Sequence, residues 1–364
     1  MLRLAARAAS ALALASALAL AVTTPALADP PQPAATDIVG VGAGTTELLF
    51  DQFSTDYNAS LAAAGDTTSP RLYSWDATGT TAITTKTGAT PIVRPDRSGP
   101  GILTLNNTTS SAVDFARSTR GPATTDPSTD LFVAMAKDAV SWAAPAGGNA
   151  PANLTKAQLL GIYNCEITNW RQIGSSLPDA TIVPVLAGHL LVDRLGVDGA
   201  AMDSSSFFLG AIGYLPPPYY GGGADRSCVR VVQRGDQGTD PVLHDPNAIV
   251  PYSVGRYVGQ VYNGRTRPGD DQGVLTVRSL DGNPAVEEPS HRIGYALATS
   301  SFAYILYNTV RANEWNTADA HGWALRNIFG VFGWICRSPV AASLVRGYGF
   351  LSLANGACGS TRHS

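Results

Sequence analysis

The chain has 364 residues and a formal net charge of −3, with 25 Lys and Arg residues against 28 Asp and Glu residues. This mild acidity argues against nucleic-acid and anionic-membrane partners, because both require a basic protein surface. A chain of this length exceeds one ordinary hydrophobic core, so we expect two domains.

Residues 1–28 have the pattern of a secretory signal peptide. Arg3 and Arg7 form a short basic region, an Ala- and Leu-rich run follows, and Ala28 ends an Ala-Leu-Ala cleavage site. A membrane anchor is the weaker alternative, because residues 23–25 (TTP) end the apolar run. We therefore expect cleavage after Ala28, a secreted chain, and a mature net charge of 23 − 28 = −5.

The mature chain is expected to be soluble. Its first cysteine is Cys165, so no lipid can be attached to a cysteine near the cleavage site. No later stretch is apolar and long enough to span a bilayer, so we expect no membrane span. Residues 29–36 (DPPQPAAT) are typical of a flexible, Pro-rich leader.

Four cysteines, an even number in an exported chain, indicate two disulfides. Three pairings are possible, and loop-closure entropy favours neighbours, so we expect Cys165–Cys228 and Cys336–Cys358. The sequence contains no close Cys-x-x-Cys or Cys/His spacing, and its five histidines are scattered. We therefore expect no metal site.

The first predicted element is a strand in residues 37–53 (DIVGVGAGTTELLFDQF), which leads through Gly-Ala-Gly into a helix. Thr45 or Thr46 is the expected N-cap, and Glu47 places a negative charge in the first turn. Unpaired backbone N–H groups at such a helix start favour an anion. The alternative is an ordinary capped turn that binds nothing.

Two further units repeat this pattern. A strand at residues 91–93 leads into a loop that contains Ser98, and a strand at residues 112–116 delivers residues 117–119 (RST) to its carboxyl end. Ligands of open α/β sheets bind at this edge. The three units together therefore predict a site for a small oxyanion.

The remaining elements continue the alternation. Residues 153–170 (NLTKAQLLGIYNCEITNW) predict a short helix capped by Asn153 or Thr155. The segment TIVPVL predicts a strand, DSSSFFLGAIG a polar turn at a helix start, and NAIVPYSVGRYVGQ a strand followed by a helix. Strands that alternate with helices indicate an α/β protein with mostly parallel sheets.

Four of these segments together carry a family resemblance: VGAGTTELLFDQF, VDFARSTRGP, LTKAQLLGIYNCEITNW and NAIVPYSVGRYVGQ. They resemble the phosphate-binding-protein-like branch of the periplasmic (type 2) binding proteins, the extracytoplasmic receptors of ABC importers. The resemblance runs from about Asp37 to the end of the chain, and its third segment is the most specific.

The resemblance implies a two-lobe fold with helices on both faces of the sheets, a ligand cleft between the lobes, and no cofactor. Two strand-like crossings are expected, near Leu131–Ala136 and near Ile249–Ser253. They would divide lobe 1, residues 37–131 and 252–364, from lobe 2, residues 132–251.

The resemblance also implies the ligand-binding residues. Three donor clusters of the family's phosphate binders are matched in lobe 1, and the nearest match to a fourth lies in lobe 2. The residues matched are Thr45 and Thr46; Ser98; Arg117, Ser118 and Thr119; and Ser204 and Ser205.

Two departures from the family pattern weaken the case for phosphate itself. The family's phosphate binders place an aspartate, which accepts the ligand's proton and so rejects sulfate, where this chain has Thr119. The fourth turn lacks its Gly-Ser-Gly-Thr, and Asp203 stands there instead, where its charge would repel an anion. A plain N-cap run is therefore the alternative for Ser204–Ser206.

Other candidate residues have ordinary alternatives. Arg117 and Arg120 could clamp an oxyanion with forked donors, or could pair with Asp126 or Asp130 at the surface. The acidic segment 236–245 is expected to be a solvated loop and not a Ca²⁺ site, because the EF-hand pattern is absent.

No catalytic motif is present, since the sequence contains no G-x-S-x-G, H-E-x-x-H or Walker loop. We therefore expect a monomeric, non-enzymatic solute-binding protein that captures a small phosphate-like or organic anion, with an ABC transporter permease as partner. The alternatives are a degenerate extracellular interaction module of the same fold and, with less support, a phosphate-ester hydrolase.

Overall fold

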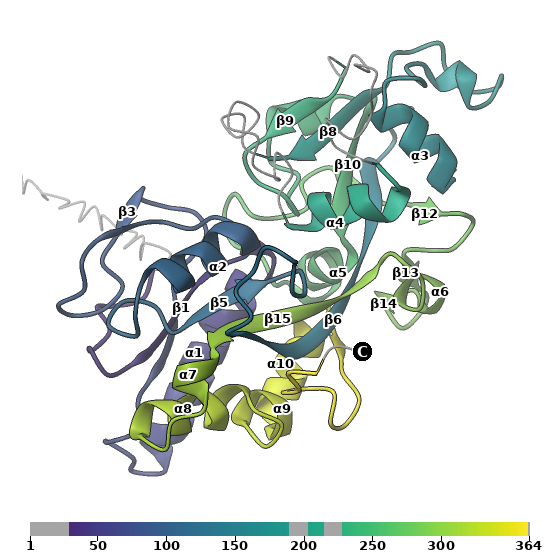
Figure 1. The fold of residues 1–364 in the computed structure, drawn as a ribbon. Helices are drawn as coiled ribbons and strands as arrows, with labels where there is room; N and C mark the ends of the chain where they lie inside the picture. Colours follow the sequence, from purple (N-terminus) through teal and green to yellow (C-terminus); the bar gives the residue numbers. More distant parts are fainter. Residues whose placement is uncertain (1–28, 189–202, 215–227, 363–364) are drawn as a thin grey trace, which may run out of the picture.

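The computed structural model describes residues 29–188, 203–214 and 228–362 (Figure 1). The predicted signal peptide and its cleavage site lie outside these residues, as does most of the altered segment before Asp203. The leader, residues 29–36, is described.

One large sheet runs through the whole molecule and has ten strands. The order along it is β2-β1-β5-β15-β6-β10-β8-β9, and β11 and β16 also pair with β6. The bounds are β1 Ile38–Gly42, β2 Leu72–Ser74, β5 Phe115–Ser118, β6 Asp130–Pro145, β8 Val183–Ala187, β9 Arg230–Val232, β10 Ala248–Ser253, β11 Leu275–Val277, β15 Ala303–Arg311 and β16 Leu351–Ser352.

Strand β6 joins the two lobes that Figure 1 shows. Nine of its first ten residues pair with β15, on the side of β1, β2 and β5. Residues 140–143 pair with β10, on the side of β8 and β9. We call these two sides the first and second lobe. The segments predicted as crossings lie within β6 and β10.

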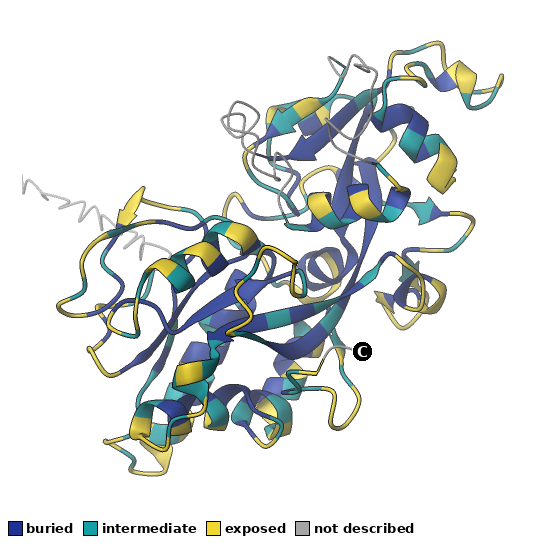
Figure 2. Cartoon of the chain, in the orientation of Figure 1, coloured by how far each residue is buried: buried dark blue, intermediate teal, exposed yellow. Residues whose placement is uncertain are grey.

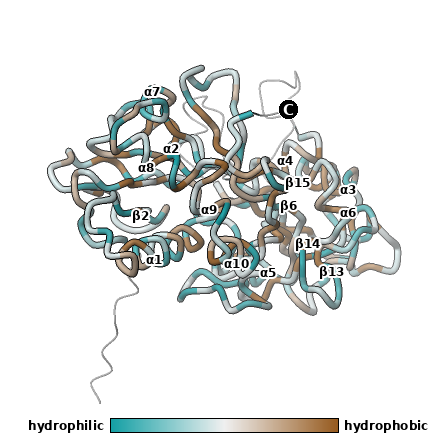
Figure 3. Tube along the Cα trace, turned by 90° about the horizontal axis from the view of Figure 1, so that it is seen from below, coloured by the Kyte–Doolittle hydropathy of each residue, from teal (hydrophilic) through white to brown (hydrophobic). Residues whose placement is uncertain are grey.

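Helices cover both faces of the sheet, and Figure 3 shows the two lobes side by side with α5 and α10 between them. The first lobe carries α1 Glu47–Ala63, α2 Ser98–Asn107, α7 Ala312–Trp315, α8 Ala320–Phe329, α9 Trp334–Arg337 and α10 Pro339–Gly347. The second lobe carries α3 Lys156–Tyr163 and α4 Asp203–Ile212, and α5 Val254–Asn263 and α6 Tyr295–Ala298 follow β10 in the chain.

Short elements complete the fold. Three two-stranded ladders pair β3 Ala82–Ile83 with β4 Ile92–Val93, β7 Asn153–Leu154 with β12 Ser279–Leu280, and β13 Val286–Glu287 with β14 Arg292–Ile293. The 3-10 helices are η1 Gly44–Thr46, η2 Trp170–Gln172 and η3 Pro241–His244.

The core lies along the central strands, which are the dark blue part of Figure 2. All five residues of β1 are buried, as expected for a strand with helices on both faces. Phe115 packs against Phe50 of α1 and Phe329 of α8, with ring centroids 5.3 and 4.8 Å apart. Gly40 faces this ring, and a Cβ there would lie 2.1 Å from it, so the aromatic packing requires glycine at this position.

The α/β class and the two-lobe fold are confirmed, and the sheet differs from the expectation in one respect. The outer pairings β1–β2, β1–β5, β8–β10 and β8–β9 are parallel, but β15 and β6 in the centre pair antiparallel with each other and with their neighbours. The parallel and antiparallel pairings occur together because long strands run back between the lobes. The alternation of strands and helices along the sequence does not reveal the direction of these strands.

Local predictions are confirmed at several points. Thr155 caps α3 in a reciprocal capping box with Gln158. Both predicted disulfides are present, Cys165–Cys228 and Cys336–Cys358. Thr46 is the N-cap residue of α1, one of the two positions expected, but η1 precedes the helix and the Thr46 side chain makes no cap hydrogen bond.

Among the described residues, no single helix has the length and hydropathy to cross a membrane. Only the stretches Ala320–Arg337 and Pro339–Gly347 taken together pass that test, and they are bent by 76°.

A buried carboxylate fastens β6 to its neighbours. Asp138 accepts hydrogen bonds from Ser253 Oγ (2.5 Å), Tyr304 Oη (2.6 Å) and the N–H of Gly255 (2.9 Å). These partners lie in or beside β10, β15 and α5. Burial raises the pKa of Asp138 to about 6, although the hydrogen bonds favour the ionised form.

The raised pKa of Asp138 predicts a pH-dependent contribution to stability. The folded chain holds this proton more tightly than the unfolded chain, so the contribution is greatest below about pH 4 and is lost as pH rises through about 6. Between pH 5 and pH 8 the loss is about 1 kcal/mol. Urea unfolding of the wild type and of Asp138→Asn at both pH values measures it. A pH-induced change that is equal in the two proteins would contradict this assignment.

Candidate functional site

Three loops of the first lobe converge at the carboxyl ends of β1 and β5. Gly42 ends β1 with φ +114°, and a Cβ there would lie 2.6 Å from the carbonyl of Arg117. A Cβ at Gly101 of α2 would lie 2.7 Å from Gly42 Cα. The glycines therefore let the start of α2 approach the turn before α1, which brings Gly44, Ser98 and Thr119 together.

The carboxylate of Asp203 occupies the point where these loops meet. Its Oδ2 accepts the N–H of Gly44 at 3.2 Å, and its Oδ1 accepts the N–H of Ser98 at 3.0 Å and Ser98 Oγ at 2.7 Å. Thr119 Oγ1 lies 3.4 Å from the same Oδ1, and Ser98 Oγ lies 3.1 Å from Thr119 Oγ1. Because Asp203 begins α4 of the second lobe, this contact crosses between the lobes.

The oxyanion held by this arrangement belongs to the chain itself, as the carboxylate of Asp203. Backbone N–H groups and hydroxyls donate to one carboxylate, and the N-terminus of α2 adds a favourable dipole. Burial raises the pKa of Asp203, and its bonds from Ser98 and Gly44 oppose that rise. From its sequence position, Asp203 is expected to repel an anion, but in the structure its own carboxylate accepts these hydrogen bonds.

A second carboxylate, Asp236, bridges the lobes beside the first. It accepts Thr45 Oγ1 at 3.0 Å, Ser204 Oγ at 2.7 Å and the N–H of Ser253 at 2.7 Å. Burial raises its pKa. The expectation of a solvated loop acid is wrong here, because Asp236 is only 4% exposed. A Cβ added at its neighbour Gly235 would lie 3.0 Å from the Cβ of Ala187, so this segment is closely packed. Residue type alone does not reveal this packing.

Ion pairs continue the contact next to these carboxylates. Arg267, in the loop between α5 and β11, pairs with Glu47 at the start of α1 and with Asp76. A second ion pair nearby joins Arg256 to Asp270 at 2.7 Å. Burial and the charge of Glu47 raise the pKa of Asp76 to about 6. The cationic side chains here are therefore already paired with carboxylates of the chain.

The structure brings only part of the predicted ligand set to the Asp203 site. Ser98 and Thr119 donate to Asp203, and Thr45 and Ser204 donate to Asp236. The others serve local structure: Thr46 is the buried N-cap residue of α1, Ser118 Oγ donates to the carbonyl of Arg120, Ser205 Oγ accepts the N–H of Ala187, and Arg120 pairs with Asp126.

Arg117 is fully buried and holds the loops of the first lobe together. Its guanidinium donates to the carbonyls of Ala43 (3.0 Å), Trp75 (2.9 Å) and Gly42 (3.1 Å), and also to the hydroxyl of Ser74. These donors are used within the lobe. Arg117 therefore supports the turn that carries Gly44 and does not itself clamp an anion.

This role predicts that Arg117→Lys is strongly destabilising. A lysine has no planar fork for these acceptors and would leave buried oxygens without donors, so we expect a loss of about 3 kcal/mol or more. Arg120→Lys is the matched control, because Arg120 pairs with Asp126 at a partly exposed site. It should change stability by no more than about 1 kcal/mol. Urea unfolding of both variants tests this, and equal small effects would contradict it.

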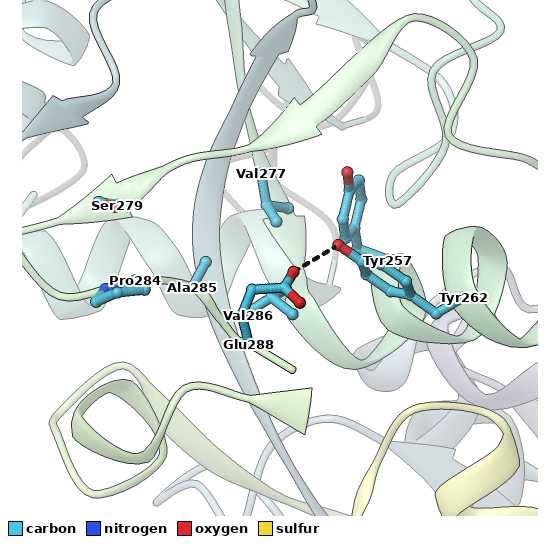
Figure 4. Close-up of a pocket in the computed structure, with 8 residues that line it drawn as sticks. All are labelled: Tyr257, Tyr262, Val277, Ser279, Pro284, Ala285, Val286 and Glu288. Atoms are coloured by element: carbon cyan, nitrogen blue, oxygen red, sulfur yellow. Dashed lines mark hydrogen bonds between the residues drawn. The ribbon is translucent and has the colours of Figure 1, made fainter. Parts of the chain in front are cut away.

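Two other pockets lie away from this site. The smaller one, about 200 Å³, is drawn in Figure 4 and is lined by residues of α5 and of the segment 277–288. There Tyr262 Oη donates to Glu288 at 3.5 Å. The larger one lies between α5, β14 and α10. Neither is lined by a predicted ligand residue.

Comparisons with known proteins agree with this fold. Residues 29–189 match the model of the PBP superfamily domain. No curated protein matches the chain in sequence. Two solved structures are similar to it: an ABC-type phosphate transport receptor from Vibrio cholerae (16% identity, TM-score 0.53) and a putative phosphate ABC transporter substrate-binding protein with bound phosphate from Clostridium perfringens (14%, 0.56). Each alignment covers 87% of this chain and 100% of the other.

A third similar structure is the high-affinity periplasmic phosphate-binding protein PfluDING bound with phosphate, at 15% identity and a TM-score of 0.51. This alignment covers 88% of this chain and 91% of the other. The matches confirm the resemblance to the phosphate-binding-protein-like branch and the two-lobe fold. The similar proteins are named as receptors and binding proteins, and not as enzymes.

Proposed function

Since residues 29–189 carry a PBP superfamily domain in a two-lobe fold, we propose that the protein is an extracytoplasmic solute-binding protein whose own Asp203 competes with its ligand. The ligand is a small oxyanion, phosphate-like in size and charge. It binds to Gly44, Ser98 and Thr119 when the carboxylate of Asp203 leaves them. The single observation that carries the proposal is the convergence of these donors on the carboxylate of Asp203.

The geometry supports a small, fully ionised anion. The donors are N–H and O–H groups that satisfy negative oxygens, and Thr119 stands where a proton-accepting aspartate would favour phosphate over sulfate. An oxyanion bound beside an ionised Asp203 would face strong like-charge repulsion. Binding therefore requires that Asp203 move away or be replaced.

Competition of this kind lowers the apparent affinity. When only a fraction of the molecules has the donors free, the apparent dissociation constant rises by the inverse of that fraction. The contacts of Asp203 and Asp236 with the first lobe compete with a ligand for these donors. The wild-type protein should therefore bind free oxyanions weakly.

Export, the ABC transporter permease as partner, and the monomeric, non-catalytic state belong to the same proposal. The signal-peptide pattern and the two disulfides support an oxidising compartment outside the cytoplasm. The predicted lobe boundaries, 37–131 with 252–364 and 132–251, are part of it as well. A hinge between the lobes would run through β6 and β10, since these strands join the two sides.

The test is isothermal titration of the chain from residue 29 to 364 with phosphate and with sulfate. Asp203→Gly removes the competing carboxylate, and glycine suits the φ of +39° at this position. We expect this variant to bind at least one of the two anions at least about tenfold more tightly than the wild type. The double variant Asp203→Gly/Ser98→Ala should lose about tenfold again, because a hydrogen bond to a charged group is removed.

Asp281→Gly is the matched control. Asp281 also has a positive φ, of 51°, and lies on the surface beside β12. It should leave anion binding at the wild-type level. Tight binding by the wild type, or an Asp203→Gly variant that binds no better, would contradict the proposed competition.

A second function is favoured by the same closed contact. If neither the wild type nor Asp203→Gly binds phosphate or sulfate, the lobes act as one rigid body, and the protein is an extracellular interaction module of this fold. The hydrogen bonds that Ser98 donates to Asp203 and Thr45 donates to Asp236, which join the lobes, support that alternative.

A further inference from the structure

A second cluster of chemically active side chains lies at the opposite end of β5 from Thr119. It contains Asp114, directly before β5, Glu314 of α7 and His321 of α8. One ligand atom of each lies within 4.8 Å of the others. His321 Nε2 is 3.5 Å from Asp114 Oδ1 and 3.6 Å from Glu314 Oε2.

Each carboxylate uses one oxygen for the protein and leaves the other facing this point. Asp114 Oδ2 accepts from Lys86 Nζ at 2.6 Å and from the N–H of Val39 at 2.6 Å. Glu314 Oε1 lies 2.9 Å from Arg311 Nε. The remaining atoms, Asp114 Oδ1, Glu314 Oε2 and His321 Nε2, are buried and have no hydrogen bond.

Burying three polar atoms that face one another without hydrogen bonds lowers the stability of the folded chain. Asp114 is fully buried. Ligands at about 2.1 Å around a tetrahedral Zn²⁺ stand about 3.4 Å apart, close to the observed separations.

We propose that Asp114, Glu314 and His321 bind one divalent transition-metal ion, with Zn²⁺ as the best fit. One imidazole and two carboxylates form a common nitrogen and oxygen ligand set for this ion, and water would complete the coordination. Lys86 and Arg311 offset the charge of both carboxylates, so the site should bind the ion with modest affinity. The ion would fasten α7 and α8 to β5, far from the oxyanion site.

The sequence pattern does not reveal this site, because its ligands are far apart in the chain. Glu314 lies 200 residues after Asp114, and His321 lies 207 residues after it. Only the path of β15 and α7 back along β5 brings them together. The absence of close His spacing therefore excludes a local metal motif and not a site assembled by the fold.

The test is isothermal titration of Zn²⁺ into the tag-free, chelator-treated chain of residues 29–364, with the metal content per chain measured after dialysis. The wild type should bind one ion. His321→Ala should weaken binding at least about 100-fold, since it removes a direct ligand. His291→Ala is the matched control, because His291 also lies beside a carboxylate, at 2.9 Å from Glu288, but on the surface. It should bind like the wild type.

Glu314→Gln serves as a second ligand variant, and circular dichroism of each variant checks that it is folded. Asp203→Gly should bind Zn²⁺ like the wild type, which separates this site from the oxyanion site. No binding by the wild type would overturn the proposal, as would equal binding by the wild type, His321→Ala and Glu314→Gln.

Discussion

The structure depends on one interaction, the carboxylate of Asp203 held by donors of the opposite lobe. A carboxylate removed from water needs several hydrogen bonds, and Gly44 and Ser98 supply them from loops that the glycines of β1 and α2 bring close. In return, the N–H of Ser98, the first residue of α2, has an acceptor. Each lobe thereby satisfies polar groups of the other.

Other buried charges act in the same direction. Asp236 repeats the contact beside Asp203, and Asp138 fastens the shared strand β6 to β10 and β15. Arg117 fixes the loops that present the donors. Buried ionised groups of this kind add little net stability, but removing one partner is costly, so they specify one arrangement of the lobes. The proposed anion site and the contact between the lobes therefore use the same donors.

The sequence predicts the fold better than the site. Regular patterns identify the α/β class, the Thr155 cap and both disulfides, because each depends on neighbouring residues or on cysteine number. The direction of β15 and the burial of Asp236 depend on contacts distant in sequence. An aspartate has the same appearance in a sequence whether it repels a ligand or replaces one, and only the donors around Asp203 decide which.

The most direct test of the account is the amide proton chemical shift of Gly44 and Ser98, measured by NMR across a pH titration. If these N–H groups donate to Asp203, both signals move as its carboxylate titrates in the wild type and stay flat in Asp203→Asn. Identical, pH-independent shifts in the two proteins would show that the donors do not bind this carboxylate, and the account of a self-occupied oxyanion site would be wrong.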